Sequence, residues 1–237
     1  MLVNFIHVPK TGGMSLKRIC GHLDNHPIRY NPHYADIYDP RIENQLIVVR
    51  NPLDRFISAV KYTIQSLKIL HTVNRATGAL VSTKRISVPT FIGKNKAQIF
   101  SRLFHLGVHT PNDWIEILKD KTHKYHDALS YIILNNEFPE LKVGPQKCEY
   151  IYLFEPQCSW HHRPKFVILM DHFQSELTFL LTSLGVDVDI PHTNRDVSVS
   201  DHKISEKNFN WIQEKYAKDF ELYYNYKETP YIERIKC

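Results

Sequence analysis

A continuous run of apolar residues, Leu46–Val49 (LIVV), places the strongest constraint on the fold of this chain. An apolar side chain at every position, instead of at alternate ones, is typical of a strand that is buried on both faces of a parallel sheet. Neighbouring parallel strands must be joined by long crossovers, which are usually helices. The run is followed by apolar residues at helical spacing, from Leu53 to Leu67. The sequence therefore predicts an α/β fold, with a central, mostly parallel sheet flanked by helices.

Strands and helices alternate along the rest of the chain. We expect further strands over residues 2–8, 150–154 and 166–170, and helices after the glycine pair at 12–13, from Pro52, from Thr110, over 125–134, over 173–184 and over a last segment that carries Phe209 and Phe220. Asn51 is a suitable N-cap for the helix that Pro52 opens, and Gly185 is a natural residue to follow a helix end. Residues 25–44 are polar and rich in proline and tyrosine, and residues 71–100 are polar and irregular. We therefore predict a single domain, residues 1–237, in which 71–100 is a variable insertion.

Composition supports a globular protein and limits the partners. Of the 237 residues, 43% are apolar and 23% are charged, which excludes a disordered chain. The formal net charge of +5 suits an anionic small ligand but is too small to indicate nucleic acid. No apolar run reaches the ~18 residues of a membrane span, and the N-terminus does not resemble a signal peptide. Among the four cysteines, Cys148 and Cys158 are close enough in sequence to bridge, but without an export signal we expect them to stay reduced. The sequence thus predicts a cytoplasmic protein.

The first predicted strand runs into a glycine-containing loop, residues 9–15 (PKTGGMS), and then into a helix. In this arrangement the glycines allow a tight turn, and backbone N–H groups together with the helix N-terminus face an anion. Lys10 adds a mobile positive charge, and the hydroxyl groups of Thr11 and Ser15 can donate hydrogen bonds. The same residues also fit an ordinary turn with a solvated lysine. In a Walker A loop the lysine follows the glycines and the next hydroxyl holds Mg²⁺, whereas here the lysine precedes them. This order argues against a nucleotide kinase and favours a reaction without a metal ion.

A second candidate site follows the buried strand. Arg50 comes directly after Leu46–Val49, and Ser58 lies about two turns into the next helix. Ligands of open α/β sheets bind outside the carboxyl ends of the strands, where a guanidinium and a hydroxyl together suit a phosphate. Alternatively, Arg50 forms an ion pair at the sheet edge and Ser58 is a small packing residue.

Together, the two segments resemble one family. Residues 9–16 (PKTGGMSL) are similar to the 5′-phosphosulfate loop of sulfotransferases that use 3′-phosphoadenosine 5′-phosphosulfate (PAPS), and residues 50–58 (RNPLDRFIS) are similar to their 3′-phosphate motif. Residues 144–146 (GPQ), 176–185 and 216–223 (YAKDFELY) resemble, more weakly, the Golgi carbohydrate branch of that family. The resemblance leaves residues 71–100 unmatched, and it implies a P-loop NTPase-like sulfotransferase fold. Two residues depart from the family pattern: Met14 stands where the family has Thr or Ser, and Asn51 stands where it has Asp.

The resemblance also implies roles for individual residues in binding PAPS. Lys10 would approach the oxygen between phosphate and sulfate and stabilise the leaving group. The 5′-phosphate would be held by the loop residues Lys10, Thr11, Gly12, Gly13, Met14 and Ser15. Arg50 and Ser58 would hold the 3′-phosphate, which distinguishes PAPS from ordinary adenine nucleotides. Apart from the resemblance, Arg195 in the polar loop 192–195 (HTNR) would either close over the nucleotide or be a solvated loop residue.

The acceptor hydroxyl needs a base, for which His33 in the segment 31–37 (NPHYADI) is the best match to the family. Glu155 is the second choice, and an exposed loop histidine is the alternative for His33 itself. His7 is more typical of a structural residue. The pair His161-His162 lacks the spacing of a zinc site, so no metal is assigned there.

The sequence thus predicts an enzyme that moves a sulfuryl group from PAPS to a hydroxyl-bearing small molecule or glycan and releases 3′-phosphoadenosine 5′-phosphate (PAP). It predicts no metal, no nucleic acid partner and no membrane span. Two alternatives stay open: a P-loop-like nucleotide or nucleoside kinase, and a catalytically silent phosphonucleotide-binding protein, which the departure at Met14 favours. Because carbohydrate enzymes of this family usually carry a membrane anchor, its absence from this sequence suggests a bacterial or viral source.

Overall fold

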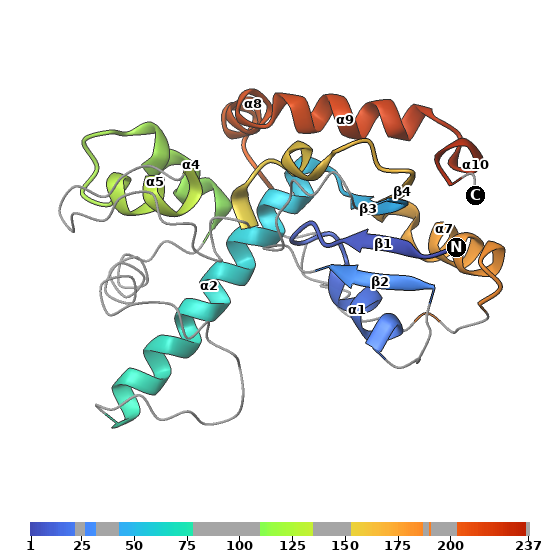
Figure 1. Ribbon diagram of the computed structural model, residues 1–237. Helices are drawn as coiled ribbons and strands as arrows, with labels where there is room; N and C mark the ends of the chain where they lie inside the picture. The colour runs from blue at the N-terminus through green and yellow to red at the C-terminus, as the bar shows by residue number, and fades with distance from the viewer. Residues whose placement is uncertain are drawn as a thin grey trace. The chain divides into compact units, whose positions relative to one another are not determined.

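The structure of the protein is a computed structural model that describes residues 1–21, 27–31, 43–77, 110–134, 153–186, 190 and 203–235. Four strands lie among these residues: β1 (Val3–Ile6), β2 (Ile28–Asn31), β3 (Gln45–Val49) and β4 (Phe166–Leu169). They form one sheet in the order β2-β1-β3-β4, and every neighbouring pair is parallel (Figure 1).

Helices connect and flank these strands. They are α1 (Gly13–Gly21), α2 (Pro52–Thr77), α4 (Pro111–Lys119), α5 (His126–Leu134), α7 (Phe173–Ser183), α8 (Glu206–Lys215), α9 (Ala217–Glu228) and α10 (Tyr231–Arg234), with the short 3₁₀ helices η2 (Gln157–Trp160) and η3 (Met170–His172). Within the described residues, no helix combines the length and the apolar character that a membrane span requires.

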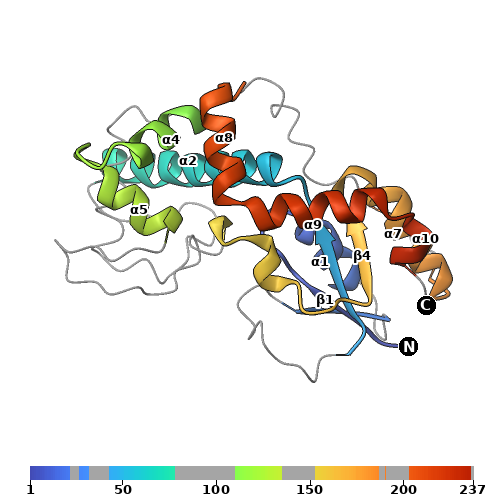
Figure 2. The same ribbon diagram turned by 90° about the horizontal axis from the view of Figure 1, so that it is seen from above.

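Side chains that alternate along β3 build an apolar layer on each face of the sheet. Leu46 and Val48 pack into a cluster that contains buried residues of α1 and α7. Ile47 and Val49 pack into a second cluster with Tyr223 of α9. α9 therefore covers the face opposite α1 and α7 (Figure 1; Figure 2). Burial on both faces explains why this strand is apolar at every position. The predicted α/β class, with a parallel sheet flanked by helices, is confirmed.

The chain divides into two compact units. The first consists of residues 1–55, 156–199 and 212–237 and contains the sheet with α1, α7, α9 and α10. The second consists of residues 56–155 and 200–211 and contains α4, α5 and most of α2 and α8. In the second unit Phe154 packs against Phe56 and Trp114, with ring centroids 5.9 and 6.2 Å apart. The prediction of one domain with an insertion at 71–100 stays a prediction.

Two helix boundaries follow the sequence signals that predict them. The side-chain oxygen of Asn51 accepts a hydrogen bond of 3.0 Å from the N–H of Leu53, which is the N-cap interaction expected for α2. After α7, Gly185 adopts a φ of 75°, and the N–H of Val186 bonds to the carbonyl of Leu181 at 2.9 Å. This is the hydrogen bond of a Schellman motif, which depends on a residue that tolerates positive φ.

Some predicted elements are wrong in extent. Leu153 and Phe154 are helical, whereas the sequence predicts a strand over 150–154; the rest of that strand lies outside the described residues. A short apolar run looks the same in a buried strand and in a buried helix, so this pattern does not distinguish the two elements. α2 continues to Thr77, because no proline or glycine interrupts it before Gly78, so residues 71–77 of the predicted irregular segment are helical.

Two further elements differ from the prediction. The single last helix is two helices, because Tyr216 leaves the helical region with φ −115° and ψ 30°. No proline or glycine marks this break. β2 lies inside the segment 25–44, which the sequence indicates only as a polar stretch. Only its first residue, Ile28, is buried, so this edge strand lacks the apolar run that reveals β3.

Candidate functional site

The order of the strands creates a natural binding position between β1 and β3. After β1 the chain continues to β2 on one side of the sheet, and after β3 it continues to β4 on the other side. Where successive connections leave in opposite directions, the loops at the carboxyl ends of the two strands diverge, and ligands of open α/β sheets bind between them. The residues that follow these two strands are the glycine-containing loop and Arg50.

The loop after β1 has a backbone conformation that L-amino acids rarely adopt. Lys10 has a φ of 66° and Gly12 a φ of 82°, both in the left-handed region. A lysine in this region is uncommon and carries strain, which such loops keep only where the surrounding structure holds them. The hydroxyl of Thr11, which is fully buried, donates to the carbonyl of Val8 at 2.7 Å. In the first turn of α1, the N–H of Ser15 donates to the carbonyl of Gly12 at 3.0 Å. The first N–H groups of a helix have no partner within it, so this turn presents donors suited to an anion.

The buried ring of His7 leaves no space for a side chain at Gly13, the second glycine of the loop. A Cβ atom at Gly13 would lie 1.9 Å from Cδ2 and 2.0 Å from Nε2 of His7. The His7 ring is buried and its Nδ1 lies 2.7 Å from the hydroxyl of Tyr30 on β2. His7 thus shapes the base of the loop, in agreement with the structural role expected for it.

Two arginines from the segment after β3 hold the carbonyl side of the loop. Nη1 of Arg50 donates to the carbonyl of Lys10 at 3.1 Å, and Nε of Arg55 donates to the carbonyl of Pro9 at 3.1 Å. Arg55 is buried, and its guanidinium lies over the ring of Trp160. In a trans peptide the carbonyl and the following N–H point in opposite directions. Because the arginines bind the carbonyls of Pro9 and Lys10, the N–H groups of the same two peptides, those of Lys10 and Thr11, point away from the arginines.

The structure brings together most of the residues that the sequence singles out. Lys10, Thr11, Gly12, Gly13, Met14, Ser15 and Arg50 all belong to the carboxyl edge of β1 and β3 in the first unit. Met14 is exposed, with 46% of its surface accessible, where the family pattern has a hydroxyl. Ser58 is buried on α2 and belongs to the second unit, as does Glu155. His33 and Arg195 lie outside the described residues, as do residues 144–146.

Sequence reasoning missed two residues that support this edge. The side-chain amide of Gln157 bonds to both backbone groups of Arg50: its oxygen accepts the N–H at 3.2 Å and its nitrogen donates to the carbonyl at 2.8 Å. The carboxylate of Asp219 in turn accepts the N–H groups of Gln157 at 2.8 Å and of Cys158 at 2.9 Å. Gln157 and Asp219 are 1% and 0% exposed. Arg50 and Gln157 are 107 positions apart, and no spacing pattern connects residues at that separation.

An acidic residue also stands near this edge, two positions after β4. Asp171 accepts a hydrogen bond of 2.5 Å from the hydroxyl of Tyr223 on α9. Burial, followed by this bond to Asp171, raises the pKa of Tyr223 above its ordinary value, so the phenol stays protonated and a donor. Asp171 lies in η3 next to Met170, whose Sδ would be 3.2 Å from a Cβ atom at Gly12.

Two other polar groups among the described residues contain a nucleophile that is protonated or buried. Cys158 is a free thiol whose pKa is raised to about 12, first by burial and then by Asp219, so it is protonated at neutral pH and a poor nucleophile. In the second unit His126 lies 3.2 Å from the hydroxyl of Ser130 and 3.0 Å from Asp127, the connectivity of a catalytic triad. Ser130, however, is only 2% exposed, so a substrate cannot reach it.

No protein-family model, no curated protein and no solved structure matches the chain significantly.

Proposed function

We propose that the protein is a sulfotransferase that moves a sulfuryl group from PAPS to the hydroxyl of an acceptor, with a carbohydrate as the acceptor class, on a P-loop-type sulfotransferase fold. The observation that carries this proposal is the hydrogen bond from Arg50 to the carbonyl of Lys10. It joins the ends of two adjacent parallel strands, whose loops separately resemble the 5′-phosphosulfate and 3′-phosphate motifs of this family. A doubly phosphorylated adenosine needs two cationic anchors at neighbouring positions, and the location of Lys10 and Arg50 at this edge supports the proposal that they are these anchors.

In the proposed reaction, the acceptor oxygen forms a bond to sulfur while the bond between sulfur and the 5′-phosphate oxygen breaks in line, and PAP leaves. Such a transfer depends on positioning and on charge stabilisation more than on covalent chemistry. Lys10 would neutralise the charge that develops on the leaving oxygen, and the backbone amides from Thr11 to Ser15 would hold the 5′-phosphate. Arg50 and Ser58 would bind the 3′-phosphate. His33 would accept the proton of the acceptor hydroxyl.

Calorimetric titration with PAP, adenosine 5′-phosphate (AMP) and Mg²⁺–ATP tests the nucleotide. A bond between a guanidinium and a phosphate contributes about 1.5–3 kcal/mol, so PAP should bind at least about tenfold more tightly than AMP. Preference for Mg²⁺–ATP would support the kinase instead and overturn the proposal.

Transfer of labelled sulfate from PAPS to a panel of glycans and small alcohols tests the chemistry. Labelled product is expected with at least one hydroxyl acceptor. Tight PAP binding together with release of sulfate to no acceptor would support the silent phosphonucleotide-binding protein, for which the exposed Met14 is the one structural argument.

A further inference from the structure

The side chain of Gln157 continues the hydrogen bonding of the sheet beyond the end of β3. Arg50 is the first residue after that strand, and its N–H and carbonyl both bond to the Gln157 amide, at 3.2 and 2.8 Å. A primary amide offers one acceptor and two donors, so it can bind both backbone groups of one residue as a neighbouring strand would. Because Gln157 is buried, its two bonds to Arg50 are shielded from competing water. They fix the backbone from which the Arg50 guanidinium extends.

Gln157 is itself fixed by α9. The carboxylate of Asp219 receives the N–H groups of Gln157 and Cys158, the first residues of η2, at 2.8 and 2.9 Å. Hydrogen bonds to an ionised acceptor are about twice as strong as those between neutral groups. One turn further along the same helix, Tyr223 packs against Ile47 and Val49, so α9 is anchored to the sheet. A continuous chain of contacts thus runs from α9 through Asp219 and Gln157 to Arg50.

We infer that Gln157 is a positioning residue that fixes Arg50 for the 3′-phosphate and thereby makes the site prefer a 3′,5′-bisphosphate over a 5′-monophosphate. This role rests on the proposed function. The loop for the 5′-phosphate has supports that do not involve Gln157: Arg55 holds the carbonyl of Pro9, and Thr11 bonds to Val8. Arg50 also bonds to the carbonyl of Lys10, so loss of the Gln157 amide should weaken recognition of the 3′-phosphate strongly and recognition of the 5′-phosphate less.

The variant Gln157→Met tests this role, since methionine has a similar length and shape but makes neither bond. Calorimetric affinities for PAP and for AMP are compared between wild type and variant. A hydrogen bond to a charged group contributes about 1.5–3 kcal/mol, so misplacing Arg50 should lower PAP affinity by about 10- to 100-fold, and AMP affinity by a clearly smaller factor. The ratio of the two affinities is the readout, because general loosening of the fold lowers both.

The matched control is Asn44→Ala, at the opposite end of the same strand. Asn44 precedes β3, has a φ of 49°, and donates from Nδ2 to the carbonyl of Leu2 at 3.2 Å. Its replacement removes one exposed side-chain bond to the backbone next to the same strand, and the ratio of PAP to AMP affinity should stay at the wild-type value.

The outcomes separate the two proposals. If wild-type protein does not prefer PAP over AMP, the proposed function is wrong and this role is wrong with it. If wild type prefers PAP and Gln157→Met keeps the same ratio, or loses both affinities equally, the proposed function stands and the role of Gln157 is wrong. If Gln157→Met does not fold, Asp219→Asn is measured instead. This change keeps the size of the side chain but weakens the contact that holds Gln157, so the ratio of PAP to AMP affinity should fall by a smaller factor than expected for Gln157→Met. An unchanged ratio in Asp219→Asn would show that the role of Gln157 is wrong.

Discussion

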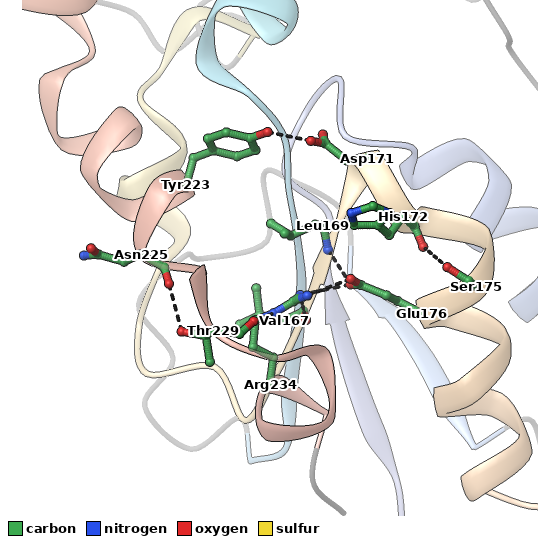
Figure 3. A network of polar contacts seen from close by, with 10 residues as sticks. All are labelled: Val167, Leu169, Asp171, His172, Ser175, Glu176, Tyr223, Asn225, Thr229 and Arg234. Carbon is green, nitrogen blue, oxygen red and sulfur yellow. Dashed lines mark hydrogen bonds and ion pairs between the residues drawn. The ribbon is translucent and has the colours of Figure 1, made fainter. Parts of the chain in front are cut away.

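The first unit contains two polar networks that attach different parts of the fold. In one, Glu176 of α7 and Arg234 of α10 form a two-pronged ion pair, with the shorter contact at 2.6 Å and both side chains 4% exposed (Figure 3). The same two side chains reach the backbone of β4: Glu176 accepts the N–H of Leu169 at 2.8 Å, and Arg234 donates to the carbonyl of Val167 at 3.1 Å. This network fastens two helices to one strand, and its positive charge is matched by a negative one.

The other network lies at the carboxyl edge of β1 and β3. There Arg50 and Arg55 donate to the carbonyl oxygens of Lys10 and Pro9. These two bonds attach the guanidinium groups to the backbone of the loop after β1. The two networks differ in what they hold: the Glu176–Arg234 pair fixes two helices to a strand, whereas Arg50 and Arg55 fix the backbone of a loop.

The largest expected effect comes from breaking the ion pair between Glu176 and Arg234. Glu176→Ala leaves Arg234 buried without its carboxylate, which costs about 3–5 kcal/mol of unfolding free energy. Urea denaturation measures the loss, and the ratio of PAP to AMP affinity should not change in the fraction that stays folded. The double variant Glu176→Met with Arg234→Met should recover much of the stability, because an apolar pair of similar volume replaces both charges. A double variant no more stable than Glu176→Ala would show that the ion pair is not the source of the loss.

The site network is tested by Lys10→Ala, which should reduce sulfate transfer by at least about 100-fold, the loss typical of removing one group that stabilises developing charge. Lys17→Ala is the matched control, since Lys17 is an exposed lysine on α1 and its removal should leave transfer near wild type. Turnover close to wild type in Lys10→Ala would contradict the role assigned to Lys10.

The backbone of Lys10 offers a second measurement. A left-handed conformation costs an L-amino acid about 1–2 kcal/mol, and glycine avoids most of this cost. Lys10→Gly should therefore keep or raise the unfolding free energy while it abolishes transfer. A destabilised glycine variant would show that contacts of the Lys10 side chain stabilise the fold by more than its left-handed backbone costs.

The sequence predicts those parts of the site that depend on neighbouring residues. The strand, glycine loop and helix, and the cap at Asn51, follow from local patterns whose geometry spans a few residues. The clamp of Gln157 on Arg50 depends on how two segments 107 positions apart are folded together. No periodicity or capping rule carries that information.

The missed elements have the same physical cause. β2 is an edge strand, so it lacks the two-sided burial that makes β3 visible in the sequence. No proline or glycine marks the break at Tyr216. Buried residues continue at helical spacing on both sides of it, so the sequence pattern predicts one helix. Tertiary packing determines both elements, and local sequence propensity does not predict how these segments pack.

A smaller effect should follow from filling the space at Gly13. Gly13→Ala would place its Cβ within 2 Å of the His7 ring, and such overpacking costs about 1–3 kcal/mol. Combining it with His7→Ala removes the clashing ring atoms, so the double variant should lose less stability than the sum of the two single variants. Thermal or urea unfolding of all four proteins measures this coupling. Strict additivity would show that His7 and Gly13 do not contact each other.

The smallest expected effect lies outside both networks and depends on pH. His161 is half-buried at the end of η2, with Nε2 2.5 Å from the hydroxyl of Tyr226, and burial followed by the nearby His162 lowers its pKa. The unfolded chain therefore binds a proton at the ordinary histidine pKa of about 6.5, while the folded chain does not bind it until lower pH. Because the unfolded state holds more protons in this window, the unfolding free energy falls as pH drops below about 6.5. His161→Gln should remove this part of the slope between pH 7 and pH 5, as measured by urea unfolding. An identical slope in the variant would place the titrating group elsewhere.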